Sequence, residues 1–201
     1  MVAFDPIVRL PPDLIRYPDD PLVLAAETWH LPRIKWDAIR KQSTGRGIAQ
    51  YQSLQNHYNL LERGDYEGAT QRFCVENEIG MTPYYGLASG YLTGKYRKAE
   101  DFKRSARGQS ARKYFEGNGP RVVDALGVIA SETGATLAQI SLAWLVNQPG
   151  IVAPIASATN VKQIEELLGI ITLALTDDQL ALLDQASAIT ERTSVIGADS
   201  R

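Results

Sequence analysis

The fold is decided by the stretch Ile79-Gly-Met-Thr-Pro-Tyr-Tyr-Gly-Leu-Ala-Ser-Gly-Tyr-Leu-Thr-Gly-Lys-Tyr96. Its first five residues form a short, mostly apolar run typical of a buried strand, and the rest is a turn rich in glycine and tyrosine. Similar short runs at residues 22–26, 51–55 and 150–155 alternate with longer segments of helical period. This alternation predicts an α/β fold in which parallel strands are joined by crossover helices.

The segments between these runs carry the signals of helix formation. Apolar residues recur at helical spacing in residues 65–78, 120–133, 137–148, 160–168 and 176–186. Thr136, Asn160 and Thr176 precede the last three segments. We predict them as N-caps, because their side-chain oxygens can accept hydrogen bonds from the free N–H groups of a first helical turn.

The chain divides into three parts. Residues 1–20 hold four prolines, which predict an extended N-terminal arm without regular helix or central strand. Residues 21–187 carry the strands and helices of the predicted domain, and residues 188–201 form a C-terminal tail without a periodic pattern. Within the domain, residues 87–119 predict an unusually long loop from a strand to a helix, and loops of that length commonly serve a function.

The composition narrows the classes of function. With 201 residues and 44% hydrophobic content the chain can bury a sizeable core, which excludes disorder. Lys and Arg total 21 against 23 Asp and Glu, so no global field recruits nucleic acid or anionic lipid. The single cysteine, Cys74, can form neither an internal disulfide nor a thiolate metal site, which suits the cytoplasm. No apolar run approaches the ~20 residues of a membrane span, so we expect neither a membrane segment nor a signal peptide.

Ligands of parallel α/β folds bind at the carboxyl ends of the strands, so the residues that follow each strand are the candidate site. The loop after the third strand concentrates positive charge beside a glycine-rich turn, in Lys95, Arg97, Lys98, Lys103, Arg104, Arg107, Arg112 and Lys113. This predicts a phosphate-facing loop. For residues 98–104 we favour the alternative of a solvated charged face. Aromatic residues interleave with the basic ones, but no stacking motif surrounds them, so a nucleic-acid partner is not expected.

Three strings at these strand ends carry a resemblance. They are Ser53-Leu-Gln-Asn-His-Tyr-Asn-Leu60, the segment from Leu87 to Tyr96, and Ala153-Pro-Ile-Ala-Ser-Ala-Thr159 followed by Gln163 and Glu166. In this order and spacing the chain, over roughly residues 22–187, resembles the C-terminal half of an aldo-keto reductase. The similar group is the bacterial one that includes enzymes like potassium-channel β-subunits. The resemblance implies a half-barrel that corresponds to strands five to eight of a TIM-type (β/α)₈ barrel.

The resemblance also implies a nicotinamide dinucleotide cofactor, NADP(H) or NAD(H), and roles for residues of this chain. Gln55 would hold the nicotinamide carboxamide, which an amide can match as donor and acceptor at once, and Tyr84 would stack on the nicotinamide ring. The pyrophosphate would be held by Leu87, Ser89, Gly90, Thr93, Gly94 and Lys95, and the adenosine end by Ser157, Thr159, Gln163 and Glu166. The alternatives are that Gln55 is bonded to neighbouring backbone and that Tyr84 is a core tyrosine, a description that suits Tyr85 better.

This chain departs from the family pattern in three places. After the first strand the family carries a Ser-Asn pair that contacts the carboxamide, where this sequence has Glu27 and Thr28, of which only Thr28 is a ready donor. Near the adenosine end no basic residue is closer than Lys162, which leaves the choice between NADP(H) and NAD(H) open. The family's catalytic Asp, Tyr, Lys and His belong to the other half of the barrel, so we expect no catalytic residue here, and we interpret His57 as structural.

Two functions from different classes follow. In the first, the chain is the cofactor-binding half of an oxidoreductase that converts a carbonyl to an alcohol by hydride transfer, acting on a small carbonyl substrate once another chain completes it. In the second, it is a truncated, non-catalytic half-barrel that acts as a nucleotide-binding or interaction module, or is a remnant. Either way, exposed sheet edges predict self-association or pairing.

Overall fold

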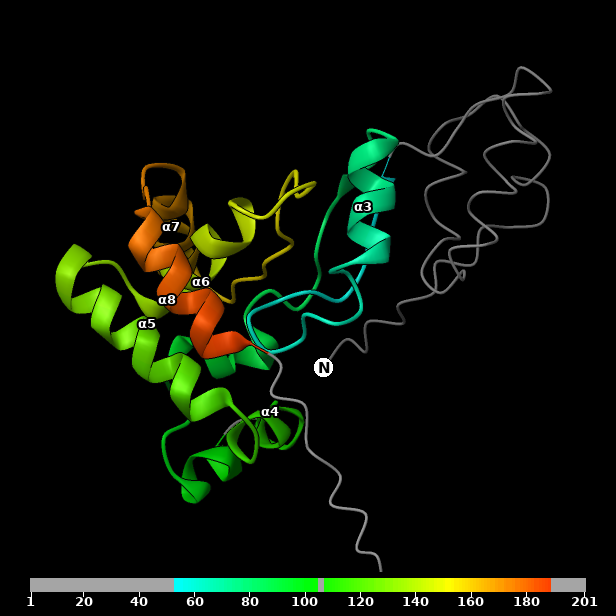
Figure 1. Cartoon of the computed structure of the whole chain (residues 1–201). Coiled ribbons are helices and arrows are strands. Elements are labelled where there is room, and N and C mark those ends of the chain that lie inside the picture. Colours follow the sequence, from blue (N-terminus) through cyan, green and yellow to red (C-terminus); the bar gives the residue numbers. More distant parts are fainter. Residues whose placement is uncertain (1–52, 105–106, 189–201) are drawn as a thin grey trace, which may run out of the picture.

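The computed structural model describes residues 53–104 and 107–188 (Figure 1). Most of these residues are in helices, and a short parallel sheet joins them, so the prediction of an α/β fold is confirmed at this level. The predicted arm at residues 1–20, the first strand at residues 22–26 and nearly all of the predicted tail lie outside the described residues.

The sheet is formed by strand ends that come together from distant parts of the chain. Strand β1 (Ser53–Leu54) runs parallel to β2 (Gly80–Met81), with Ser53 opposite Gly80 and Leu54 opposite Met81. On the other side of β2, Met81 forms a parallel bridge with Ile151. The predicted fourth strand at residues 150–155 is therefore wrong in extent, because it bonds to β2 at intervals rather than as a continuous ladder. Its N–H groups at Val152 and Ile155 donate to the carbonyls of Met81 and Pro83.

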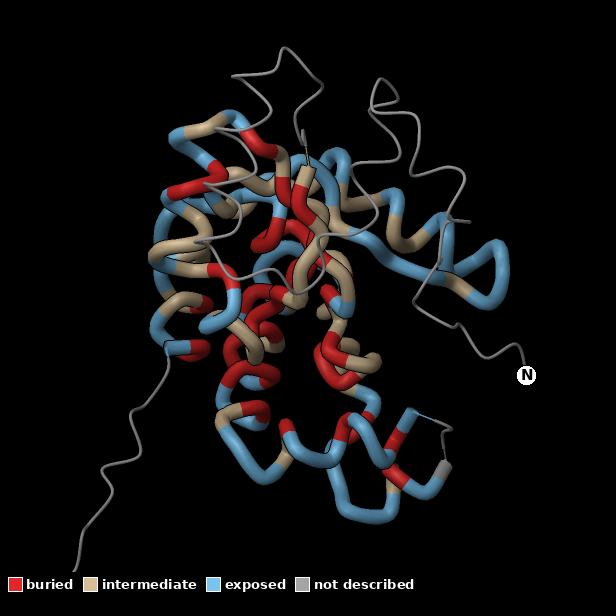
Figure 2. Tube along the Cα trace, turned by 90° about the vertical axis from the view of Figure 1, so that its right-hand side faces the viewer, coloured by how far each residue is buried: buried red, intermediate tan, exposed pale blue. Residues whose placement is uncertain are grey.

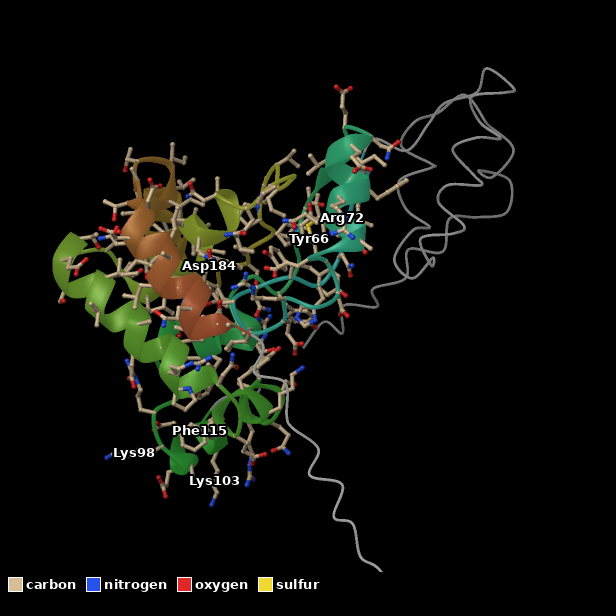
Figure 3. The ribbon with its side chains drawn as sticks, in the orientation of Figure 1. Tyr66, Arg72, Lys98, Lys103, Phe115 and Asp184 are labelled. Atoms are coloured by element: carbon tan, nitrogen blue, oxygen red, sulfur yellow. The ribbon has the colours of Figure 1, made fainter. Side chains whose placement is uncertain are left out.

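Helix α3 (Ala69–Glu76) links β1 to β2 and lies within the predicted segment 65–78. Phe73 and Cys74 are buried on its inner face. Tyr66, just before the helix, is fully buried, and its hydroxyl donates to the carbonyl of Pro149 at 3.0 Å (Figure 3). This bond ties α3 to the segment that leads into Ile151.

The segment predicted as a long loop holds three short helices, which corrects that expectation. They are η2 (Ala88–Thr93), η3 (Ala99–Arg104) and α4 (Gly108–Phe115). Aromatic side chains in and between these helices are part of the hydrophobic core, with Tyr96 and Phe102 stacked at a centroid distance of 5.1 Å. Because Tyr96 and Phe102 are buried, they cannot stack on nucleic-acid bases. Figure 2 shows exposed and buried residues alternating in this part of the chain.

The main core lies among α5 (Gly119–Thr133), α6 (Leu137–Val146) and α8 (Asp177–Ser187), with α5 and α8 side by side in Figure 1. Helix α6 is buried on nearly every side, as its apolar composition predicts, and Trp144 on it is fully buried. The predicted caps are confirmed, because Thr136 and Thr176 each form a capping box with the glutamine three residues later.

Helix α7 (Val161–Leu168) begins after Asn160, whose side chain accepts a hydrogen bond from the N–H of Gln163 at 3.0 Å, as predicted. Its amphipathic pattern predicts that Ile164, Leu167 and Leu168 face the core. That prediction is correct for Leu167 only, since Ile164 is 49% exposed and Leu168 is 56% exposed. Among the described elements α7 packs mainly against α6 and the short helix η4 (Gly169–Ile171), which leaves its outer apolar side uncovered.

Candidate functional site

The carboxyl ends of the parallel segments meet at one edge of the sheet, and the predicted nicotinamide residues lie there. Gln55 directly follows β1 and is partly exposed. Tyr84 follows β2, and its N–H donates to the carbonyl of Asn56 at 3.0 Å. Gln55 and Tyr84 are thus held on neighbouring strand ends by the backbone ladder itself. The N–H of Ile155 donates to the carbonyl of Pro83. The segment that leads to Ser157 and Thr159 therefore starts at the same edge.

Tyr84 belongs to a cluster of three aromatic rings. The His57 ring stacks on the Tyr84 ring with centroids 5.4 Å apart and planes 12° from parallel. Tyr85 meets both rings edge-on, at 5.5 Å from His57 and 5.4 Å from Tyr84. Tyr85 is 55% exposed, so the interpretation of Tyr85 as a core tyrosine is wrong. Its backbone has a φ of 56°, which turns the side chain out of the sheet.

Burial shifts the pKa values of this cluster. Partial burial lowers the pKa of His57 below 6.5, and Lys113 adds to the effect while Glu62 and Asp65 oppose it. The ring is therefore neutral at pH 7. Burial likewise raises the pKa of Tyr84 above 10.0, with smaller contributions from Asp65 and Tyr85, so its phenol stays protonated.

The loop after Tyr84 makes a tight turn with a left-handed backbone. Leu87 has φ −101° and ψ 15°, and the next residues Ala88, Ser89 and Gly90 have φ of 49°, 57° and 85°. Within this turn the N–H of Ala88 donates to the carbonyl of Tyr85 and the N–H of Gly90 donates to the carbonyl of Leu87, both at 2.8 Å. The predicted pyrophosphate residues Leu87, Ser89 and Gly90 form this turn.

Gly90 and Lys95 lie in close contact in this loop. A Cβ added at Gly90 would lie 2.8 Å from Nζ of Lys95, so the ammonium group sits directly over the glycine backbone. The same Nζ lies 5.0 Å from the centroid of the Tyr96 ring. Thr93 closes the turn by donating from Oγ1 to the carbonyl of Gly90 at 2.8 Å, and Gly94 ends it at a φ of 77°. Lys95 therefore brings a positive charge to this turn.

The other basic residues of the loop differ in position. Arg97 donates from Nε to the carbonyl of Gly94 at 3.2 Å, at the end of the same turn, whereas Lys98 and Lys103 are exposed and extend from the outer edge of the molecule (Figure 3). Ion pairs join Arg97 to Asp124, Arg112 to Glu116 and Lys113 to Glu62. Residues 87–95 stay the predicted phosphate-facing part of the loop, and the exposed charges of Lys98 and Lys103 suit a solvated face.

The predicted adenosine residues lie on the surface around the start of α7. Ser157, Thr159 and Gln163 are exposed, while Glu166 is partly buried. The Gln163 side chain folds back over the helix start, where its Oε1 accepts from the N–H of Thr159 at 2.8 Å and from the Thr159 hydroxyl at 3.0 Å. The carbonyl of Glu166 accepts a hydrogen bond from Gln139 at 2.6 Å, which anchors α7 on α6.

Thr28 lies outside the described residues, so its role stays a prediction. Asn59, to which sequence reasoning gave no role, is fully buried, and its side chain bonds to the carbonyl of Tyr85 and to the ring of His57, the two residues whose rings contact Tyr84. The signal for it was a polar residue between two apolar ones, Tyr58 and Leu60, in a strand-end string. A buried amide is rare unless its hydrogen bonds are satisfied.

The sequence of this chain matches a known family. The model of the aldo/keto reductase family covers residues 33–188, more than half of the chain, and the chain belongs to that family. It is 31% identical over 166 residues to the aldo-keto reductase yakc [NADP(+)] of Schizosaccharomyces pombe, which covers 81% of this chain and 47% of that protein. It is 27% identical over 187 residues to the aldo-keto reductase dtxS3 of Metarhizium robertsii, which covers 92% of this chain and 47% of that protein.

A third relative comes from the channel-associated branch that the sequence strings suggest. A probable voltage-gated potassium channel subunit beta of Arabidopsis thaliana is 34% identical over 122 residues, which covers 56% of this chain and 36% of that protein. The chain spans about half or less of the length of these curated relatives. In the part of the chain that the structure describes, no helix is both long and apolar enough to cross a bilayer.

Proposed function

We propose that this chain binds a nicotinamide dinucleotide as the cofactor-binding half of an aldo-keto reductase-type oxidoreductase, which converts a carbonyl to an alcohol. The observation that carries the proposal is the pairing of strand ends. In its support, the N–H of Tyr84 donates to the carbonyl of Asn56, the residue next to Gln55, and the loop that follows Tyr84 contains a left-handed turn with the ammonium of Lys95 over Gly90. When bound, the cofactor supplies the hydride.

The residues present suit the parts of a dinucleotide. The Gln55 amide offers a donor and an acceptor to the carboxamide, and the Tyr84 ring offers a flat surface to the nicotinamide. The N–H groups of Leu87 and Ser89 would hold the pyrophosphate together with the ammonium of Lys95, which lies over Gly90. At the adenosine end, Ser157, Thr159, Gln163 and Glu166 would contact the ribose and adenine.

NADP(H) is the preferred form in this proposal. A relative that shares 31% identity carries NADP(+) in its name. In this chain Lys162 is exposed in the first turn of α7, where its charge adds to the partial positive charge of the helix start. A 2′-phosphate would be attracted there more than a 2′-hydroxyl, so NADPH should bind more tightly than NADH.

The second part of the proposal concerns the group that protonates the carbonyl oxygen. We place this group on a second polypeptide, which would dock at the edge beyond Ile151. Val152 is 63% exposed and Ile155 is 41% exposed at this edge, so an apolar surface is open for pairing.

We also propose a cytoplasmic location, because the single cysteine of the chain is buried and cannot form an internal disulfide.

A titration of the full chain with NADPH and with NADH, followed by tryptophan and nucleotide fluorescence, tests the proposal. We expect saturable binding that Gln55→Leu and Tyr84→Ala each weaken roughly tenfold, since stacking and a good hydrogen-bond pair contribute about 1–3 kcal/mol each. Gln71→Leu on α3, outside the predicted site, is the matched control and should bind normally. Absence of saturable binding by the folded chain would refute the cofactor site.

Turnover separates the two functional classes. The chain alone should not oxidise NADPH in the presence of small aldehydes or ketones, because its own residues are proposed to bind the cofactor only. Steady turnover that Tyr84→Ala abolishes would contradict the half-barrel proposal. Nucleotide binding without turnover, whatever partner is added, would favour the alternative of a non-catalytic binding module.

A further inference from the structure

Asn59 is a fully buried amide whose polar atoms all have partners. Its Oδ1 accepts a hydrogen bond from the N–H of Leu61 at 2.8 Å, and its Nδ2 donates to the carbonyl of Tyr85 at 3.0 Å. The same Nδ2 lies 3.3 Å from Nε2 of His57. An amide nitrogen has two hydrogens, so both of these bonds can form at once. Asn59 therefore connects the segment after β1 to the segment after β2.

The first of these bonds fixes the backbone at Tyr85. This residue has a φ of 56°, a conformation that side chains other than glycine adopt rarely. The Asn59 amide holds the carbonyl of Tyr85 in that conformation across 26 residues of sequence. Because Tyr85 lies between Tyr84 and the turn at residues 87–90, this bond sets how the chain leaves the sheet on its way into the loop.

The second bond sets the state of the His57 ring. Nε2 can accept from Asn59 only if it carries no proton, so the neutral ring has its hydrogen on Nδ1. Partial burial, which lowers the pKa of His57, favours the same neutral form. Glu62, Asp65 and Lys113 are the charged groups that act on the ring, and Tyr84 and Tyr85 contact it.

The oriented His57 ring in turn supports Tyr84. The two rings are stacked at 5.4 Å and nearly parallel, and His57 and Tyr84 also form a parallel bridge through their backbones. One buried amide thus bonds both to the residue whose ring is stacked on Tyr84 and to the backbone just after Tyr84.

We propose that Asn59 and His57 are positioning residues that hold the Tyr84 ring at the angle needed to receive the nicotinamide. This inference rests on the proposed function, because it assigns a role in the same cofactor site. This positioning role differs from a role in stability alone, because loss of Asn59 or His57 should weaken cofactor binding by displacing the Tyr84 ring. Neither residue needs to touch the cofactor.

A double-mutant cycle tests the inference on the full chain. His57→Ala should weaken NADPH binding roughly three- to tenfold, the range expected for loss of an aromatic pair. The same change made in a Tyr84→Ala background should have no further effect, because the ring that His57 supports is gone. His57→Phe keeps the stacked ring and should restore most of the affinity. Urea unfolding of every variant confirms that folded protein is compared.

Asn59 is tested by Asn59→Ser, with Asn147→Ser as the matched control. Asn147 also donates from its side chain to a backbone carbonyl, that of Ala143 at 2.8 Å, but lies at the end of α6. We expect Asn59→Ser to weaken NADPH binding and to move the Tyr84 ring proton resonances in the nucleotide-free protein, and Asn147→Ser to do neither. If Asn59→Ser does not fold, the cycle on the half-buried His57 decides the question.

The outcomes separate this inference from the proposed function. If the unaltered chain does not bind NADPH, the cofactor site and this inference fall together. If the unaltered chain binds and folded His57→Ala binds equally well, the inference is overturned and the cofactor site stands. Additive losses in His57→Ala and Tyr84→Ala would also overturn it, because His57 would then act independently of Tyr84.

Discussion

Arg63 and Asp184 lie 121 residues apart in the chain, and their side chains form an ion pair with Nη1 of Arg63 3.0 Å from Oδ1 of Asp184. Arg63 also bonds to Glu67 at 2.6 Å, and its guanidinium lies 5.2 Å from the centroid of the Trp144 ring. The indole N–H of Trp144 donates to the same Asp184 oxygen at 3.1 Å. This cluster joins the segment after β1 to α6 and α8.

Removal of Arg63 should therefore destabilise the protein. Arg63→Ala leaves Glu67 without its cation and removes the cover of Trp144, and the Arg63 side chain is only 14% exposed. We expect a loss of about 2–4 kcal/mol in the free energy of unfolding, measured by urea denaturation. Arg112→Ala removes an exposed pair with Glu116 and should cost less than about 1 kcal/mol. Equal losses in the two variants would contradict the assigned role of Arg63.

Two glycines of α5 should respond to alanine in opposite directions. Gly127 lies inside the helix, and a Cβ added there meets no atom within 4 Å, so Gly127→Ala should raise the free energy of unfolding by about 0.5–1 kcal/mol. Gly134 ends the helix at a φ of 72°, so Gly134→Ala should lower it by about 1 kcal/mol. Thermal unfolding of both variants provides the measurement, and a shift of the same sign in both would refute the reasoning.

Cys74 should make the protein less stable at alkaline pH. Burial raises the pKa of the Cys74 thiol from 9.0 to about 11, so the unfolded chain loses this proton at lower pH than the folded chain. The contribution of Cys74 to stability is complete below pH 9.0 and is lost as the pH rises toward 11, by about 2–3 kcal/mol.

The measurement is urea unfolding between pH 8 and pH 11, with Cys74→Ala as the comparison. The variant should lose stability less steeply than the unaltered chain over this range, because the buried tyrosines still contribute to both. Identical slopes would show that the thiol ionises alike in the folded and unfolded states.

Substitutions at Lys95 and Lys98 should distinguish a charge that binds phosphate from a charge on the solvated face. Lys95→Ala removes the ammonium that lies over Gly90, and we expect NADPH affinity to fall roughly tenfold and its salt dependence to weaken. Lys98→Ala removes an exposed charge outside the turn and should leave the affinity within twofold. The same fluorescence titration at two salt concentrations measures both, and equal effects of the two changes would mean that only the general charge of the loop matters.

Local signals predicted much of the fold. Thr136, Asn160 and Thr176 begin helices as expected, because a cap depends on residues only three positions away. The extent of pairing at residues 150–155 was not predictable, since the bonds to Met81 and Pro83 join segments about 70 residues apart. The helical spacing of Ile164 and Leu168 correctly predicted that they lie on the apolar side of α7. The spacing does not indicate which element covers that side, and both residues are exposed.

The candidate site, like the fold, was predictable only in part. Gln55, Tyr84 and Lys95 could be singled out in the sequence because each lies at a strand end or in the loop just after it. Asn59 could not be assigned, because its partners His57 and Tyr85 are known only once the backbone has brought two strand ends together. The exposure of Tyr85 depends on a left-handed backbone that nothing in its residue type indicates.

The burial of Cys74 has a practical consequence for spectroscopy. It is the sole cysteine of the chain and is 1% exposed, so a maleimide dye would react far faster with a cysteine introduced at an exposed position such as Lys98. A fluorophore or spin label can therefore be attached at one chosen place without first removing the native thiol. Distances within the folded chain, and between two associated copies, become measurable in solution.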